Sequence, residues 1–91
     1  MPVTVLIPTV LQKLTDGRDE IQTSGQTIQG VLDGLRTTHT ALVDRITTPE
    51  GGLKPFLNVF VNGDDIRFAD DVRTSVNDGD EISIVPSIAG G

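Results

Sequence analysis

Two stretches of alternating apolar residues, one near each end of the chain, constrain the fold more than any other feature. Val3, Val5 and Ile7 alternate with two other residues and are followed by Pro8. Residues 81–86 are rich in β-branched side chains and also stop at a proline. A period of two is typical of β-strands, and proline limits a strand because it lacks the N–H that a ladder needs. The sequence therefore predicts a strand in each place.

One helical stripe lies between these strands. Ile28, Val31, Leu32 and Leu35 fall at i, i+3, i+4 and i+7, and the hydroxyl of Thr27 can accept from a free N–H of the first turn. Gly30 and Gly34 share one side of this helix, which indicates close packing against a sheet. Residues 41–46 predict a further short helical turn, and residues 47–55, with two Pro and two Gly, predict a loop.

The remaining segments complete a mixed sheet. Residues 19–23 and 57–61 predict strands, residues 66–68 predict a short returning strand, and Asn62-Gly63 and residues 77–80 predict turns. The order strand, strand, helix, strand, short strand, strand favours an α+β sheet with one main helix on one face. If the first and last strands pair in parallel, both are central, which is the β-grasp arrangement. We expect one domain at 1–86 and a flexible tail at 87–91.

Composition narrows the class of protein. A chain of 91 residues suits one domain with a modest core, and it has no Cys, no run of 18 apolar residues and no basic segment followed by an apolar stretch at its start. We therefore expect a cytoplasmic protein without a membrane span. The formal net charge of −6 argues against nucleic acid and favours a partner with a basic surface.

No catalytic group is assembled in the sequence. His39 is the only His and lies at an expected helix end, where we interpret it as a surface residue. The acidic runs 64–65 and 78–81 resemble cation ligands, but the EF-hand spacing is missing and Asp and Gly are what tight turns require. We predict turns there, no metal site and no catalytic residue. Phosphate-binding glycine motifs are also missing, so any ATP must be bound by another protein.

The tail is the remaining candidate for chemistry. Residues 87–91 read Ser-Ile-Ala-Gly-Gly and follow the proline that closes the last strand. Glycine lacks a β-carbon, so Gly90-Gly91 can thread a narrow channel, and the tail spans about 17 Å at ~3.4 Å per residue. Ile88 can anchor at the mouth of such a channel. A frayed terminus is the alternative interpretation, because most domains have one.

The chain resembles the ubiquitin-like sulfur carriers of the ThiS/MoaD type over its whole length. The most specific match is residues 77–91, NDGDEISIVPSIAGG, which fit a D-G-D-x-[IV]-[ST]-[IV]-x-P strand leading to an A-G-G end. Residues 57–68, LNVFVNGDDIRF, also look like the middle strand and hairpin of that family. The opening strand, the long segment before Phe56 and the tail are most similar to the CysO-like carriers of cysteine synthesis.

The resemblance implies a β-grasp fold and a carrier that is a substrate of other enzymes, not an enzyme. An adenylating enzyme of the ubiquitin-activating type would activate the carboxylate of Gly91 with ATP and Mg²⁺, and a sulfur source would convert it to a thiocarboxylate. Gly90 would give clearance, while Ile88 and Ala89 would form the rest of the presented tail. In the CysO-like case, a cysteine synthase with pyridoxal phosphate would accept the sulfur, and a metallopeptidase would release the product.

Two alternatives stay open. The sulfur can serve molybdopterin, thiamin or tRNA thiolation instead of cysteine, or Gly91 can join the chain to lysines of other proteins as a ubiquitin-like modifier. A third reading is a plain β-grasp binding module with an inert tail.

Overall fold

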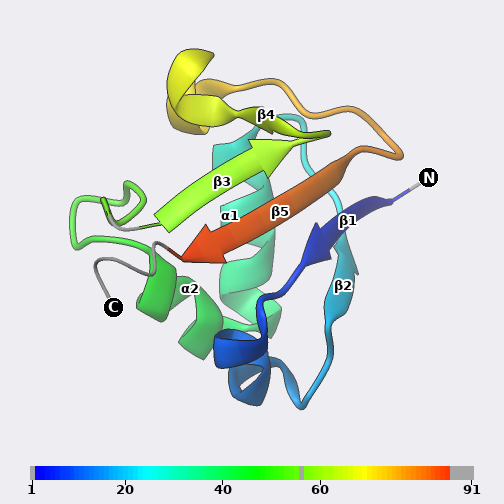
Figure 1. The fold of residues 1–91 in the computed structure, drawn as a ribbon, viewed down its shortest axis with the longest axis vertical. Coiled ribbons are helices and arrows are strands. Elements are labelled where there is room, and N and C mark those ends of the chain that lie inside the picture. The colour runs from blue at the N-terminus through cyan, green and yellow to red at the C-terminus, as the bar shows by residue number, and fades with distance from the viewer. Residues whose placement is uncertain (1, 56, 87–91) are drawn as a thin grey trace.

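The computed structural model describes residues 2–55 and 57–86. Its strands are β1 (Val3–Leu6), β2 (Glu20–Thr23), β3 (Leu57–Val61), β4 (Asp64–Asp65) and β5 (Glu81–Pro86). The α-helices are α1 (Ile28–Thr38) and α2 (Thr40–Ile46), and three 3-10 helices are η1 (Thr9–Thr15), η2 (Ile66–Phe68) and η3 (Asp71–Arg73). Figure 1 shows the sheet crossing the molecule with α1 behind it.

The five strands form one mixed sheet in the order β2-β1-β5-β3-β4. β1 pairs with β2 in antiparallel fashion and with β5 in parallel, where Val5 lies opposite Ile82. β5 and β3 are antiparallel, and β4 continues the sheet beyond β3. The first and last strands are thus neighbours near the middle of the sheet, which confirms the predicted β-grasp fold.

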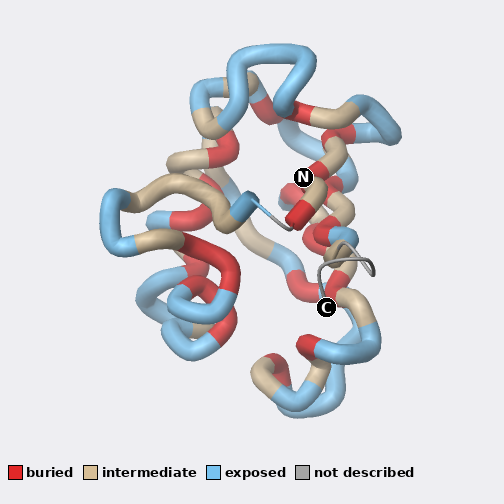
Figure 2. The backbone as a smooth tube through the Cα atoms, turned by 60° about the vertical axis from the view of Figure 1, so that its left-hand side comes forward, coloured by how far each residue is buried: buried red, intermediate tan, exposed pale blue. Residues whose placement is uncertain are grey.

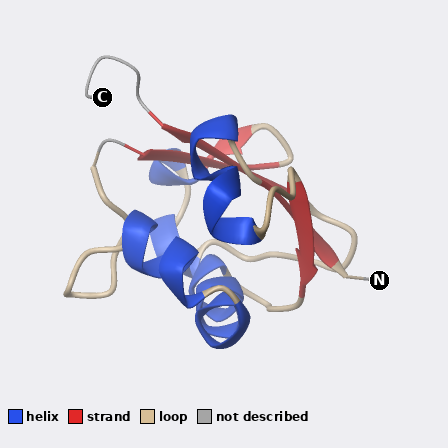
Figure 3. Ribbon diagram, turned by 90° about the horizontal axis from the view of Figure 1, so that it is seen from below, coloured by secondary structure: helices blue, strands red, loops and turns tan. Residues whose placement is uncertain are grey.

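The core lies between the sheet and the helices. Inward residues of β1, β5 and β3 alternate with outward ones, and the predicted stripe of α1 is buried against them together with three residues of α2. Figure 2 shows these buried positions along the strands and helices, and Figure 3 shows α1 and α2 together on one side of the sheet. The main buried side chains include Val5, Leu35, Leu42, Val59 and Ile84.

Local hydrogen bonds explain where α1 begins and how closely it approaches β2. The hydroxyl of Thr27 accepts from the backbone N–H of Gly30 at 3.1 Å, so the predicted N-cap is confirmed. A β-carbon on Gly34 would lie 3.4 Å from Oγ1 of Thr23, at the end of β2. Gly34 therefore lies close to the end of β2, at the edge of the sheet, and Gly30 faces Thr27 and Gly25 in the connection between β2 and α1.

The predicted turns are confirmed, but one predicted strand is wrong. Asn62 and Gly63 have φ of 50° and 90°, and the turn at residues 77–80 has Gly79 at φ 85°. Residues 66–68, expected as a strand, form η2 instead, and the returning strand is the preceding pair of aspartates in β4. The reason is local: a carboxylate oxygen of Asp65 accepts from the backbone N–H of Arg67 at 2.9 Å and caps the helical turn.

Within the described residues, no helix has the length and apolar character that a membrane span requires.

Candidate functional site

The end of β5 is where the fold presents the predicted tail. Ile82 and Ile84 are buried, and the strand is held between β1 on one side and β3 on the other. Pro86 lies opposite Leu57 at the last register position of β3 and β5. The N–H of Leu57 donates instead to the carbonyl of Lys54 at 3.1 Å, and Pro86 has no N–H, so the ladder ends here.

Five residues follow this fixed end in the sequence. The predicted site residues Ile88, Ala89, Gly90 and Gly91 lie outside the described residues, as does Ser87. The structure therefore places Pro86, the residue from which the predicted tail starts and which we call the root of the tail. It does not place Gly91, the predicted reactive end. Their assignment as the presented tail remains a prediction, and so does the division into a domain at 1–86 and a tail at 87–91.

The face of the sheet turned away from α1 and α2 leads to this root. We call it the open face. It consists of the outward side chains of β1, β5 and β3, all partly or fully exposed: Thr4, Leu6, Asn58, Phe60, Glu81, Ser83 and Val85. Leu6 and Phe60 flank Ser83 across the three strands, and Val85 lies opposite Asn58.

The open face is apolar beside the root of the tail. Val85 is 43% exposed, and a shallow hollow of about 280 Å³ is lined there by Leu6, Ile7, Pro8, Ser83, Ile84, Val85 and Pro86. Clustered apolar surface of this kind marks a protein interface more often than a small-molecule site, because it is shallow and open. It is therefore a candidate surface for contact with another protein.

Sequence reasoning missed this face. A signal was present, because Leu6, Phe60 and Val85 are apolar at positions that the alternation assigns to the outer side of their strands. They come from three different strands, so only the register shows that they gather near one another.

A polar network borders the open face at its β4 side. The guanidinium of Arg67 donates to both carboxylate oxygens of Asp65, at 3.4 and 3.1 Å, and to the side-chain oxygen of Asn58. These hydrogen bonds from Arg67 hold the pKa of Asp65 below its usual value, and Asp65 raises the pKa of Arg67. The network joins β4 and η2 to the outward side of β3.

The acidic turns that resembled cation ligands are used in hydrogen bonds. Asp80 accepts from the backbone N–H of Asn77 at 2.8 Å and from the side-chain amide of Asn62 at 3.0 Å. These two donors lower the pKa of Asp80, the backbone donor first. In the described part of the chain, no three His, Cys, Asp or Glu side chains are grouped as metal ligands.

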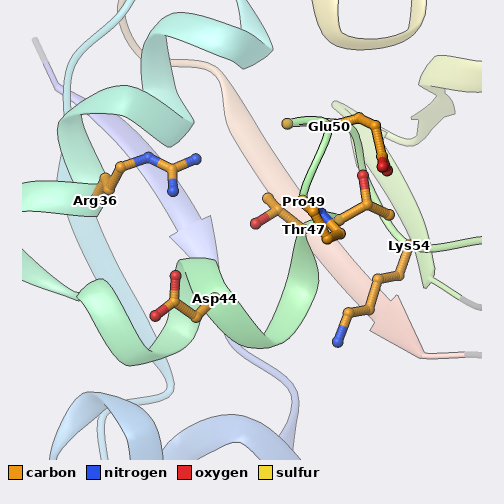
Figure 4. Close-up of a pocket in the computed structure, with 8 residues that line it drawn as sticks. Arg36, Asp44, Thr47, Pro49, Glu50 and Lys54 are labelled. Carbon is orange, nitrogen blue, oxygen red and sulfur yellow. The ribbon is translucent and has the colours of Figure 1, made fainter.

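A second hollow lies beside α2. It has a volume of about 600 Å³ and is lined by Arg36, Asp44, Thr47, Thr48, Pro49, Glu50, Gly51 and Lys54. Figure 4 shows Arg36 on one side and Glu50 and Lys54 on the other, with Asp44 on α2. Two cations and two carboxylates share this open hollow, so it offers no field of one sign for a phosphate or a metal ion.

The single His takes a structural position. His39 lies between α1 and α2, where its backbone N–H donates to the carbonyl of Leu35 at 2.6 Å. Its Nδ1 is 3.0 Å from Oγ1 of Thr38, in a contact with a neighbour in sequence. The residue ends one helix and begins the next, as the prediction of a helix end requires.

Comparison with models of known protein families identifies the family of this chain. The ThiS family profile matches residues 5–91. The chain belongs to the ThiS family.

Relatives of this ThiS-family chain are named as sulfur carriers. It is 38% identical to the sulfur carrier protein CysO of Mycobacterium tuberculosis over 93 residues, with 100% of both chains covered. It is 34% identical to a putative sulfur carrier protein of Archaeoglobus fulgidus over 91 residues, again with 100% of both covered.

Solved structures of related proteins match this chain with a similar sequence identity. The crystal structure of the Amycolatopsis orientalis BexX/CysO complex matches with a TM-score of 0.90 and 37% identity, covering 98% of this chain and 99% of that one. M. tuberculosis CysO matches with a TM-score of 0.88 and 35% identity, covering 94% and 99%. This ThiS-family chain therefore shares both the sheet and the helix arrangement of ubiquitin-like carriers.

Proposed function

We propose that this protein carries sulfur as a C-terminal thiocarboxylate on Gly91. The observation that supports it most is a central strand, β5, that ends at Pro86 and continues in the sequence into Ser-Ile-Ala-Gly-Gly. The relatives named sulfur carrier proteins support the same role. The chain itself is a substrate of other enzymes and not a catalyst.

The chemistry requires two steps at the carboxylate. An adenylating enzyme of the ubiquitin-activating type transfers AMP from ATP, with Mg²⁺, to the carboxylate of Gly91 and releases pyrophosphate. Hydrosulfide, or a donor that delivers sulfur at the same oxidation level, then attacks the acyl carbon, and AMP leaves with the electrons of the broken C–O bond, so that a thiocarboxylate remains. The open face rests on the enzyme, while Ile88, Ala89, Gly90 and Gly91 reach the reacting atoms, because glycines leave room in a narrow channel.

Cysteine synthesis is the accepting pathway that we propose. The CysO relatives support this choice. A cysteine synthase would then take the sulfur with its own pyridoxal phosphate, a metallopeptidase would release the product, and all steps would occur in the cytoplasm. Molybdopterin, thiamin and tRNA thiolation are the alternative destinations.

The mass of the intact protein tests the proposal. Co-expression with the adenylating enzyme and a sulfur donor should shift the mass by one exchange of oxygen for sulfur. Deleting Gly91 should abolish the shift and leave the circular dichroism spectrum and the melting temperature unchanged. A wild-type mass that stays the same with an enzyme shown to be active on another carrier would refute the proposal.

Conjugation to other proteins is a second candidate function. It is favoured by 35% identity over 65 residues to small archaeal modifier protein 3 of Haloferax volcanii, with 71% of this chain and 70% of that one covered. Isopeptide adducts that disappear when Gly91 is deleted would support it. The only lysines of the sequence are Lys13 and Lys54. The protein therefore offers few sites at which further copies of itself could be attached through isopeptide bonds.

A further inference from the structure

Phe68 is the most exposed large apolar side chain in the described residues. It is 88% exposed, against 63% for Val10 and 43% for Val85. Its segment is η2, at the edge of the sheet beyond β4 and opposite to the edge formed by β2. Phe68 does not line the apolar hollow beside Pro86.

The turn that carries Phe68 is anchored on both sides. Ile66 is 1% exposed and holds η2 to the core, while Val72 of η3 packs against the core from the other side. The N–H of Ala69 donates to the carbonyl of Ile66 at 3.0 Å, and the N–H of Asp70 donates to the hydroxyl of Thr74 at 3.1 Å. The aromatic ring is thus presented from a defined turn, which lowers the entropy that binding must overcome.

Acidic residues outnumber basic ones in the sequence on both sides of Phe68. Residues 64–73 hold four acidic and two basic side chains, a net charge of −2, and Arg67 is engaged with Asp65. Asp64, Asp70 and Asp71 are exposed on either side of Phe68 in the sequence. An apolar pocket bordered by Lys or Arg is the surface that complements such an arrangement in shape and charge.

The turn is continuous with the open face. β4 pairs with β3 through Phe60 and Asp65, and Arg67 of η2 reaches the side chain of Asn58 on that face. A protein that covers the open face and extends past β4 reaches η2, the turn that carries Phe68.

We propose that Phe68 is an anchor for the adenylating enzyme and inserts into an apolar pocket with a basic rim on that enzyme. This inference rests on the proposed function, because it names a contact of the enzyme that would activate Gly91. Phe68 and Asp70 contribute affinity and orientation, and they take no part in the reaction at the carboxylate.

Calorimetric titration of the purified adenylating enzyme of the same organism with the full chain tests the contact. Phe68→Ala should weaken binding about tenfold or more, as a buried interface anchor does, and Phe68→Leu should restore part of it. Asp70→Lys should weaken binding further and reduce its dependence on salt. Asp33→Lys is the matched control, because Asp33 is an exposed residue of α1 and the substitution makes the same change of charge. It should weaken the binding of the enzyme less than Asp70→Lys does.

The thermal stability of each variant shows that the fold is intact, since Phe68 and Asp70 are exposed. Unchanged affinity of Phe68→Ala, or an equal effect of Asp70→Lys and Asp33→Lys, would overturn the inference. The inference would also be overturned if Phe68→Ala weakened only the binding of the sulfur-accepting enzyme, or only the association of the protein with itself. The masses of the same variants, co-expressed with the adenylating enzyme and a sulfur donor, separate the two proposals. A thiocarboxylate on the wild type together with unchanged binding of Phe68→Ala refutes only this inference, and a wild type that is never thiocarboxylated refutes both.

Discussion

The side chain of Asn62 joins the turn between β3 and β4 to the turn before β5, because its amide donates to a carboxylate oxygen of Asp80 at 3.0 Å. The side-chain oxygen of Asn62 also accepts from the N–H of Glu81 at 3.0 Å. Asn62 has φ of 50°, a conformation that asparagine tolerates better than most residues. One residue therefore sets both a turn and the start of the central strand.

The first prediction follows from the pKa of Asp80, which its hydrogen bonds from Asn77 and Asn62 lower. A lowered pKa in the folded state stabilises the fold above the usual pKa of aspartate, about 3.9, and this stabilisation is lost as the pH falls through the folded value. Asn62→Gly keeps the turn but removes one donor, so the pKa of Asp80 in the folded state should rise. The stabilisation should then be smaller, and its loss should be complete at a higher pH than in the wild type. NMR titration of the side-chain carboxyl groups measures the pKa of Asp80 in both proteins, and the pKa of Asp65 serves as a reference that should not change. An unmoved pKa of Asp80 would contradict the assignment.

The second prediction concerns the packing of the loop before α1. A β-carbon on Gly25 would lie 2.7 Å from the backbone nitrogen and 2.9 Å from Cγ2 of Val31. Gly25→Ala should therefore lower the free energy of unfolding by about 1–3 kcal/mol, as overpacking does. Urea denaturation measures the change. Gly52→Ala is the control, because its nearest neighbour would be 3.8 Å away, and equal stability of both variants would count against the packing described.

The third prediction concerns the core under the sheet. Leu35 of α1 is 2% exposed, so Leu35→Ala should leave a cavity and cost about 2–5 kcal/mol of unfolding free energy. Val10→Ala, at a 63% exposed position, should cost less than about 0.5 kcal/mol. Chemical denaturation of both variants compares them directly, and a small loss at Leu35 would show that the helix is less tightly packed than the structure has it.

The fourth prediction concerns the open face. Val85→Glu should slow formation of the thiocarboxylate, because a charge would be placed where the adenylating enzyme is proposed to rest, while melting is little affected at this exposed position. Thr37→Glu adds the same charge on exposed α1 and should react like the wild type. Timed mass spectra of the reaction give both rates, and matching rates would exclude this face from the contact.

The sequence predicted the regular parts of the fold because local chemistry decides them. Residues 81–86 are a strand as expected, and Asn62-Gly63 adopts positive φ at both positions. The strand predicted at 66–68 was wrong, since the alternation there is too short to compete with the cap from Asp65. The alternation of apolar and polar residues at 66–68 gives no indication of that cap.

The site was predictable only in part. A tail that follows a proline can be read from the chain, and its root at Pro86 lies at the end of a central strand. The open face depends on which strands are neighbours, because Leu6, Phe60 and Val85 are far apart in sequence and come together only through the register. Long-range pairing of this kind is a property of the whole fold.

The position of β5 between β1 and β3 has a consequence for synthesis in the cell. β1 and β3 leave the ribosome before β5 does. Until β5 emerges, the pair β2-β1 and the pair β3-β4 are therefore not joined by the central strand. Such non-local pairing delays folding until late in translation. The ribosomal exit tunnel covers the residues made last, so residues 87–91 have already been synthesised when β5 can join the sheet. Chains that lack β5 would leave the facing edges of β1 and β3 unpaired and open to proteases and to aggregation.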